Sequence, residues 1–192
     1  MKQYGFYYDA ENCIGCHTCH IACKDTNRLE VGKNFRTVRT FTTGSGFTPR
    51  MYHLSMACNH CEDAVCIPAC ENDAISRDDC GLVVMDAEKC IGCGNCAHTC
   101  PYHAIIKMPT GKAGKCEGCA TLRALGEEVA CVASCPQRVL FFGPIDELKA
   151  KHASEGLVST AAPLPPASAT KPNLVMRVKD CMDDMDFDEI VL

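Results

Sequence analysis

The stretch Cys90–Pro101 reads CIGCGNCAHTCP, and a closely related stretch, CIGCHTCHIAC, occupies Cys13–Cys23. In both, three cysteines follow at steps of three residues and a fourth comes four residues later. Three thiolates at this spacing can surround three corners of an iron–sulfur cube, while the fourth reaches a second cube. Such an internal repeat predicts a duplicated metal-binding architecture.

Working outward from the repeat, sixteen of the eighteen cysteines fall into groups of four, each opening with CxxC and closing with CxxxC. We call them quartets one to four; in order, they are Cys13, Cys16, Cys19 and Cys23; Cys58, Cys61, Cys66 and Cys70; Cys90, Cys93, Cys96 and Cys100; and Cys116, Cys119, Cys131 and Cys135. At four thiolates each, they predict four [4Fe–4S] clusters bound through iron.

Disulfides and zinc are the other common uses of clustered cysteines. Disulfides are typical of short secreted chains, but residues 1–9 contain no extended apolar run that would indicate a signal peptide. A four-thiolate zinc site would suit quartet four alone, whereas the regular steps of quartets one and three favour iron. A zinc-stapled interaction module without redox activity is therefore the remote alternative.

Composition and charge exclude several classes of function. The formal net charge is −5, and four oxidised cubes at about −2 each would bring it to roughly −13. Nucleic-acid binding requires the opposite sign, and no run of roughly 18 apolar residues could span a membrane. Because no Ser-His-Asp set, phosphate loop or dinucleotide motif occurs, we expect no catalytic site in this chain.

Short strands and helices are predicted around the quartets. The two CxxxC steps Cys19–Cys23 and Cys96–Cys100 contain no Gly or Pro and suit helices, in which residues four apart are separated by about 6 Å along the axis. One helical turn can thus offer a thiolate to each of two cubes. Alternating or apolar runs predict strands at Tyr4–Tyr8, Phe35–Thr43, Leu82–Met85, Val139–Phe142 and Leu174–Val178.

The composition changes after about residue 153. Residues 159–172 are rich in Ala, Pro, Ser and Thr and predict an extended, polyproline-like segment. The end of the sequence is acidic and also contains Phe187, Ile190, Val191 and Leu192, which are unusual in a solvated tail. We consider both a disordered tail and an arm laid over a partner protein, and favour the arm.

Several other residues lie among or near the quartets. Cys80 and Cys181 are lone cysteines and are interpreted as small buried or incidental residues rather than as ligands. The imidazoles of His17, His20, His60 and His98 are surplus to sixteen thiolates and are interpreted as neighbours of the clusters or surface groups. Three lysines are candidates to offset cluster charge: Lys24, Lys107 and Lys115.

If the fourth cysteine of each quartet serves a neighbouring cube, the quartets must pair, and the spacing alone permits several pairings. At this point the sequence resembles a known family, the four-cluster electron-transfer subunits of molybdopterin oxidoreductases, and most of all the iron–sulfur subunits of dimethyl sulfoxide reductases. The resemblance covers nearly the whole sequence up to about Val178. It is carried by Tyr4-Gly5-Phe6, by the CIGC words, and by Cys58–Asp63, Cys100-Pro101-Tyr102, Cys116–Cys119, Phe142–Leu148, Ala162–Pro165 and Thr170–Asn173.

The resemblance implies an α+β fold of two interleaved ferredoxin-like domains with long loops and an extended C-terminal tail. Residues 1–50 with 112–152 would hold two clusters, the inserted residues 51–111 two more, and residues 153–192 would form a partner-binding tail. The implied ligands are Cys13, Cys16, Cys19 and Cys135 for cluster 1; Cys116, Cys119, Cys131 and Cys23 for cluster 2; Cys58, Cys61, Cys66 and Cys100 for cluster 3; and Cys90, Cys93, Cys96 and Cys70 for cluster 4.

The resemblance also implies a role. The protein would relay electrons between a donor, a quinol or a membrane subunit, and a large molybdopterin-containing catalytic subunit, with a membrane anchor as a further candidate partner. A relay for a formate dehydrogenase, hydrogenase or other reductase is the alternative. We expect a peripheral protein held at the membrane through partners, on the extracytoplasmic face by co-export rather than in the cytoplasm. The short loop Thr40–Arg50 and the acidic end after Lys179 depart from the family pattern.

Overall fold

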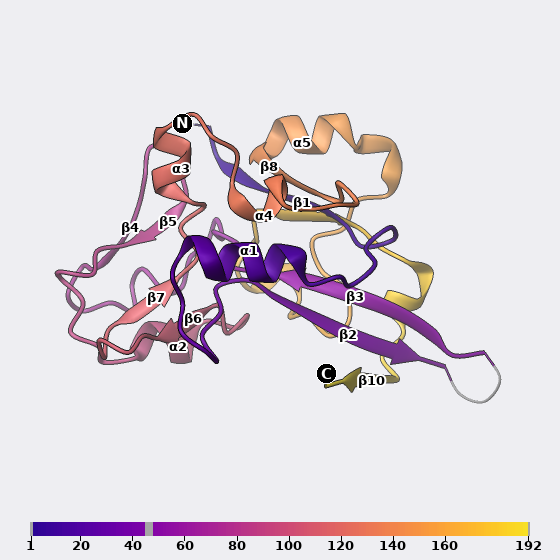
Figure 1. Cartoon of the computed structure of the whole chain (residues 1–192), viewed down its shortest axis with the longest axis horizontal. Coiled ribbons are helices and arrows are strands. Elements are labelled where there is room, and N and C mark those ends of the chain that lie inside the picture. Colours follow the sequence, from indigo (N-terminus) through magenta and orange to yellow (C-terminus); the bar gives the residue numbers. More distant parts are fainter. Residues whose placement is uncertain (1, 45–47, 192) are drawn as a thin grey trace.

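The computed structural model describes residues 2–44 and 48–191, which form short helices and small sheets (Figure 1). The strands are β1 Tyr4–Asp9, β2 Thr37–Thr43, β3 Arg50–Met56, β4 Ile75–Arg77, β5 Val83–Met85, β6 Ile105–Lys107, β7 Ala113–Lys115, β8 Leu140–Pro144, β9 Leu174–Arg177 and β10 Phe187–Ile190. The α-helices are α1 Thr18–Thr26, α2 Asn95–Thr99, α3 Ala120–Ala124, α4 Ala130–Ala133 and α5 Ile145–Lys151, with 3-10 turns at Ala153–Glu155, Ala167–Ala169 and Asp180–Asp183. The α+β class expected from the sequence is confirmed.

The first strand lies at the centre of a sheet in the order β8-β1-β9. It pairs antiparallel with β8 and parallel with β9, so that Tyr7 lies opposite both Phe141 and Val175. Successive side chains of a strand point to opposite faces. Phe6 and Tyr8 therefore enter the main core while Tyr7 packs under α5. The sheet joins the beginning of the polypeptide to its last third.

Strands β2 and β3 form a long hairpin, and the C-terminal strand β10 pairs with the free edge of β2. In Figure 1 this hairpin extends away from the rest of the molecule. Phe41 of β2 packs on Tyr52 of β3 and on Phe187 of β10. The acidic end is thus ordered on the protein's own sheet, and Cys181 and Met182 just before it are buried in the main core.

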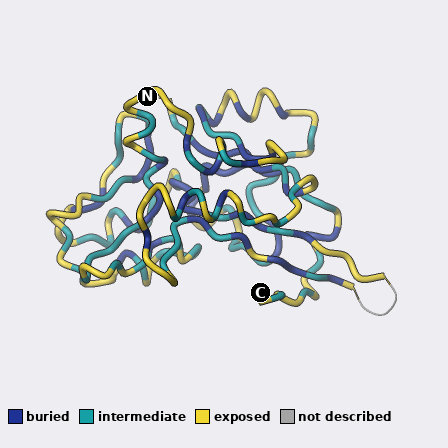
Figure 2. The backbone as a smooth tube through the Cα atoms, viewed as in Figure 1, coloured by how far each residue is buried: buried dark blue, intermediate teal, exposed yellow. Residues whose placement is uncertain are grey.

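The middle of the sequence forms two small hairpins, β4–β5 and β6–β7, with α2 between them. Its core is small: Ile75, Val83 and Ile105 pack with the sulfurs of Cys66 and Cys96. Buried backbone is concentrated near the centre of the molecule and the periphery is exposed (Figure 2). A core this thin and this rich in cysteine indicates that bound metal contributes to stability.

All five predicted strands and both predicted helices are present, with small shifts at their ends. The prediction of a continuous extended segment at residues 159–172 was wrong. The segment contains turns and the 3-10 turn Ala167–Ala169. A polyproline helix has no internal hydrogen bonds of its own, so turns that do form hydrogen bonds can interrupt it. The two hairpins β2–β3 and β6–β7 span the expected domain boundaries near residues 50 and 111. Residues 45–47 of the short loop, and Leu192, lie outside the described residues.

Candidate functional site

The structure groups the cysteines in a crossed arrangement. One cavity is lined by Cys13, Cys16 and Cys19, from the loop before α1 and its first turn, and by Cys135, from the segment after α4. Its empty volume, including the mouth, is about 330 Å³. Three thiols of quartet one and the last of quartet four thus face a common space.

Two further cavities repeat this arrangement in the middle of the sequence. One, of about 370 Å³, is lined by Cys58, Cys61, Cys66 and Cys100; the other, of about 360 Å³, by Cys90, Cys93, Cys96 and Cys70. Their other walls are mainly apolar, with Val83 and Ile105 in the first and Ile75 and Met85 in the second. Each of the three cavities is lined by three cysteines of one quartet and the last cysteine of another, which indicates three occupants of the same kind.

The packing of α1 on α4 gathers the other four thiols, Cys23, Cys116, Cys119 and Cys131. Burial raises the pKa of Cys23 to about 11, against the lowering effect of Arg36, and the charges of Cys131 and Cys119 raise it further. Burial likewise raises the pKa of Cys116, and the charge of Cys23 is the next largest cause of the increase. Three thiols of quartet four therefore interact with the last thiol of quartet one.

Backbone geometry shapes the loops between the cysteines. Gly92 has a φ of +75°, and a Cβ there would lie 2.4 Å from the carbonyl oxygen of Gly111. This position therefore requires glycine. Backbone N–H groups also donate to cysteine sulfurs: Ala113 to Cys90 at 3.4 Å, Ala74 to Cys70 at 3.4 Å, Gly118 to Cys116 at 3.4 Å and Val139 to Cys135 at 3.5 Å.

The thiols fit a multi-iron group. Burial raises the pKa of Cys61 to about 11 and that of Cys66 to about 12, so these thiolates need a strong positive charge to form at neutral pH. Among residues 2–44 and 48–191, no three His, Cys, Asp or Glu side chains are placed to hold a single metal ion. Each of the three cavities is lined by four cysteines, the number of thiolates that one [4Fe–4S] cluster takes.

Sequence comparisons agree with this geometry. Residues 49–145 match the 4Fe–4S dicluster domain family. The sequence is 40% identical to the B subunit of the anaerobic dimethyl sulfoxide reductase of Haemophilus influenzae (over 92% of this protein and 90% of the relative) and 42% identical to that of Escherichia coli (91% and 88%). It is 39% identical to the thiosulfate reductase electron transfer subunit of Salmonella typhi over 76% of this protein and 78% of the relative.

This protein belongs to the iron–sulfur electron-transfer subunits of the dimethyl sulfoxide reductase type. Members of this family relay electrons within a reductase complex and work with a separate catalytic subunit. Four [4Fe–4S] clusters, and the role of an electron-transfer subunit rather than a catalytic one, both expected from the sequence, are confirmed. The family favours iron over the zinc alternative.

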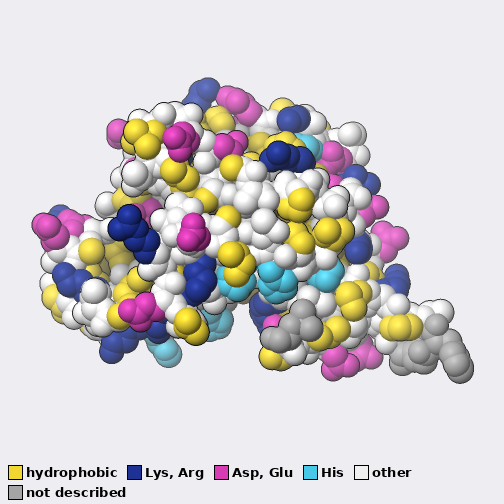
Figure 3. All heavy atoms as spheres, viewed as in Figure 1, with side chains coloured by type: hydrophobic (Ala, Val, Ile, Leu, Met, Phe, Trp, Pro, Cys, Tyr) yellow, Lys and Arg dark blue, Asp and Glu magenta, His cyan; other side chains and the backbone are white. Residues whose placement is uncertain are grey.

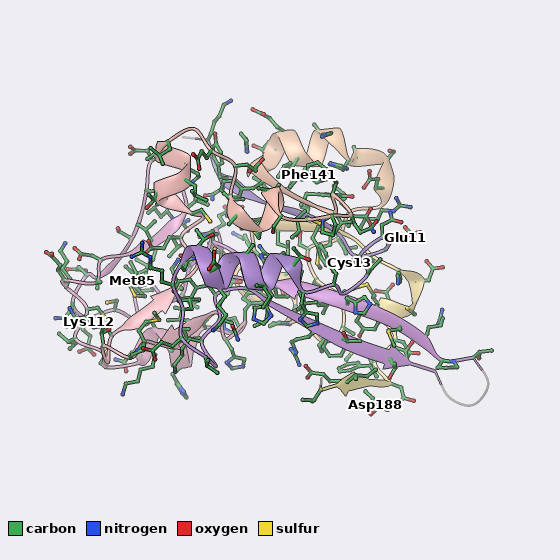
Figure 4. The ribbon with its side chains drawn as sticks, viewed as in Figure 1. Glu11, Cys13, Met85, Lys112, Phe141 and Asp188 are labelled. Atoms are coloured by element: carbon green, nitrogen blue, oxygen red, sulfur yellow. The ribbon has the colours of Figure 1, made fainter. Side chains whose placement is uncertain are left out.

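This iron–sulfur subunit exposes its two repeated CIGC loops. Cys16 and Cys93 are exposed, and the adjoining Ile14 and Ile91 are 57% and 68% exposed. Figure 4 shows Cys13, which lines the first cavity, far from Met85, which lines the cavity of Cys90. The cavities beside the two loops therefore lie in separate parts of the molecule.

The histidines of the subunit divide by burial. Figure 3 shows imidazoles gathered in the middle of the visible face, along the lower edge of α1, and the rings of His17 and His20 lie 5.9 Å apart. His98 is exposed. His60 is fully buried, its Nδ1 accepts the N–H of Val83, and burial holds its pKa well below the ordinary value, so it is neutral.

Of the three lysines singled out in the sequence, Lys107 is exposed, and Lys24 donates to loop carbonyls. Lys115 is buried beside Cys116. Sequence reasoning missed a second buried cation, Arg36, because nothing in its local sequence distinguishes it from a solvated arginine. The lone Cys181 is buried in the main core, while Cys80 lies 3.3 Å from Nη1 of Arg123.

No helix within the described residues is both long enough and apolar enough to cross a membrane.

Proposed function

We propose that the sixteen quartet cysteines hold the four clusters in the sets that the resemblance implies. The observation that carries this proposal is the crossed lining of the cavities, each with three cysteines of one quartet and the last of another. The sets are Cys13, Cys16, Cys19 and Cys135 (cluster 1); Cys116, Cys119, Cys131 and Cys23 (cluster 2); Cys58, Cys61, Cys66 and Cys100 (cluster 3); and Cys90, Cys93, Cys96 and Cys70 (cluster 4).

These sets give a linear order of clusters. Helix α1 carries Cys19 for cluster 1 and Cys23 for cluster 2, about 6 Å apart along the axis. Cys116 of cluster 2 interacts with Cys58 of cluster 3. The short segment from Cys96 to Cys100 then joins clusters 4 and 3. Each cluster supplies one-electron chemistry, and the polypeptide holds neighbours close together in the order 1-2-3-4.

The exposed CIGC loops make clusters 1 and 4 the ends of this relay. One end would face a large molybdopterin-containing catalytic subunit and the other a donor, either a quinol or a membrane anchor subunit. The names of the relatives, dimethyl sulfoxide reductase and thiosulfate reductase, support a catalytic partner of this class. Location at the membrane through these partners, on the extracytoplasmic face by co-export, is part of the same proposal.

A relay for a formate dehydrogenase, hydrogenase or other reductase is the second candidate. It uses the same clusters, and the match to a thiosulfate reductase subunit shows that the family serves more than one reductase. Purification of the native complex separates the two: a large molybdopterin subunit active on sulfoxides supports the first. A large subunit that acts on formate, thiosulfate or another substrate but not on sulfoxides, or a nickel–iron or flavin subunit, supports the second.

The proposed domain organisation follows the same sets. Residues 1–50 with 112–152 would hold clusters 1 and 2, and the inserted residues 51–111 clusters 3 and 4, with the hairpins β2–β3 and β6–β7 joining the two units. Residues 153–192 would remain the partner-binding tail. Because β9 and β10 pair with the protein's own strands, a partner would contact their outer faces.

The ligand sets are tested with serine variants of two cysteines from one quartet. Cys131→Ser should alter only the electron paramagnetic resonance signal of cluster 2, whereas Cys135→Ser should alter only that of cluster 1. The matched control for each variant is a serine variant of another cysteine of the same proposed ligand set, Cys119→Ser for cluster 2 and Cys16→Ser for cluster 1. Each control should alter the same signal as the variant it accompanies. The sets are wrong if Cys135→Ser and Cys119→Ser change the same signal. The relay itself is wrong if the wild-type protein lacks iron and acid-labile sulfide at about sixteen per molecule.

A further inference from the structure

Arg36 is an arginine buried among thiols. Its side chain is 3% exposed, and Nη1 donates to the carbonyl oxygen and to Oγ of Ser55 at 3.0 and 3.1 Å. Its guanidinium lies 4.8 Å from the centre of the Phe6 ring. Within the described parts of the protein, no carboxylate lies at ion-pair distance from Arg36. Nε is buried there without a hydrogen-bond partner.

The countercharge of Arg36 comes from cysteines of two different cluster sets. Ser55 Oγ, which accepts from Arg36, lies 3.2 Å from Sγ of Cys19 in the first set. Burial alone would lower the pKa of Arg36, but the charges of Cys131, Cys116, Cys19 and Cys23 together raise it. Through Ser55, Arg36 reaches Cys19 on α1, and Cys23, proposed for cluster 2, lies one turn further along the same helix. Arg36 therefore stands between the places proposed for clusters 1 and 2.

Lys115 repeats this situation one step along the relay. Its side chain is 2% exposed, and Nζ donates to the carbonyl oxygens of Val83 and, at 2.8 Å, of Cys116. Val83 lines the cavity of Cys58, Cys61, Cys66 and Cys100, and the charge of Lys115 acts to lower the pKa of Cys66 in that cavity, against the larger effect of burial. No carboxylate among the described residues forms an ion pair with it. Lys115 therefore stands between the places proposed for clusters 2 and 3.

A buried cation without a carboxylate is costly unless another negative charge compensates it. Here the compensating charge would be that of thiolates on iron–sulfur clusters, whose negative charge would increase when an electron is added. A fixed positive charge nearby favours the reduced state, so it raises the reduction potential. A cation between two clusters raises both potentials and leaves distant clusters unchanged.

We propose that Arg36 and Lys115 are positioning residues of the relay that set its potentials pairwise, Arg36 raising those of clusters 1 and 2 and Lys115 those of clusters 2 and 3. This inference rests on the proposed ligand sets. Neither side chain belongs to a proposed ligand set, but the two positive charges would keep the inner clusters of the relay reducible.

The test is a redox titration of the full-length, cluster-loaded protein, followed by electron paramagnetic resonance under anaerobic conditions. In Arg36→Gln we expect the equilibrium constant for reduction of clusters 1 and 2 to fall at least tenfold, about 59 mV for a one-electron couple. Lys115→Gln should shift clusters 2 and 3 in the same way. The matched control is Arg39→Gln, because Arg39 is half-exposed and paired with Glu189; no cluster should move.

The outcomes separate this inference from the proposed function. Wild-type protein without four clusters would end the proposed function itself. Loaded Arg36→Gln protein with the potentials of the Arg39→Gln control would overturn the role of Arg36 and leave the relay intact. If Arg36→Gln fails to retain clusters 1 and 2, Arg36→Lys decides: retention of both with near wild-type potentials supports the role of charge. Loss of the clusters in Arg36→Lys as well overturns it, since shape would then be what the site requires.

Discussion

Gly92 and Gly94 lie two residues apart in the same ligand loop, and both have positive φ angles, +75° and +87°. Only Gly92 is also crowded, since a Cβ would meet the carbonyl oxygen of Gly111 at 2.4 Å, whereas a Cβ on Gly94 would meet nothing within 4 Å. The pair separates the two reasons for a glycine in such a loop, backbone conformation and close approach.

We expect Gly92→Ala to deplete cluster 4 of iron, because the loop must move away from Gly111 and carries Cys90 and Cys93 with it. Gly94→Ala should cost only the left-handed conformation, about 1–2 kcal/mol, and keep its iron. Iron content and the thermal midpoint of cluster bleaching measure both effects. Equal iron content in the two variants would show that close approach does not matter.

His53 lies on β3, with its Nδ1 3.0 Å from Oγ1 of Thr40. Burial, and then the positive charges of Lys179 and His17, lower the pKa of its imidazole. Below the ordinary pKa of about 6.5, the unfolded protein takes up a proton at this position before the folded protein does. Protonation therefore favours unfolding, and stability falls as the pH drops from about 6.5 towards the lowered pKa.

We expect the thermal midpoint of the wild type to fall more steeply than that of His53→Gln between about pH 7.5 and 5.5. The comparison uses the slopes, since the substitution also removes the contact with Thr40. His98→Gln, at an exposed position, controls for the loss of an imidazole. Parallel curves for wild type and His53→Gln would contradict the prediction.

At the scale of elements, β10 is held on β2 by two contacts of different kinds. Arg39 donates from Nε and Nη2 to the carboxylate of Glu189 at 2.7 and 2.5 Å, on a half-exposed surface. Phe187 packs edge-on against the ring of Phe41, 5.6 Å away. Exposed ion pairs contribute up to about 1 kcal/mol, while an aromatic pair adds about 0.5–1.5 kcal/mol beyond its buried area.

We therefore expect Phe187→Ala to release β10 and Glu189→Gln to leave it in place. Hydrogen–deuterium exchange of the amides of β10 measures this directly: exchange should rise at least tenfold in Phe187→Ala and by less in Glu189→Gln. Iron content should stay the same in both, because β10 carries none of the proposed ligands. A larger effect of Glu189→Gln would show that the ion pair dominates.

The elements that the sequence predicts are those with a local cause. The CxxxC steps form helical turns in α1 and α2 because residues four apart share one helix face, and the apolar run Val83–Met85 forms a strand. The strand β3 and the pairing of β10 with β2 were missed, because polar residues such as Arg50 and Asp188 interrupt any clear alternation. Arg36 was missed for a related reason: its burial depends on cysteines distant in the sequence, at Cys116 and Cys131.

At the scale of the whole molecule, exposure rises toward the two ends of the proposed relay. Cys16 and Cys93 are exposed, while Cys23, Cys116 and Cys131 of the second set are buried. Solvent and oxidants reach clusters through exposed ligand loops, and thiolate oxidation follows exposure. The ends of the relay should therefore be its chemically weakest points.

On brief exposure of the loaded protein to oxygen, we expect clusters 1 and 4 to lose iron before clusters 2 and 3. Electron paramagnetic resonance follows the four signals, and alkylation with mass spectrometry should mark Cys16 and Cys93 first. Early loss of the cluster 2 signal, or early alkylation of Cys116, would contradict this order. The wild-type protein kept without oxygen is the control.

The central position of β1 has a consequence for synthesis on the ribosome. Tyr7 pairs with Phe141 and Val175, so its first partner strand emerges roughly 130 residues later, on the order of ten seconds at about 5–20 residues per second. The ligands proposed for clusters 3 and 4 all lie between Cys58 and Cys100 and are available well before Cys116 and Cys135 are made. The clusters in the middle of the polypeptide would then be loaded first. Strand β1 would stay unpaired until β8 and β9 have been synthesised.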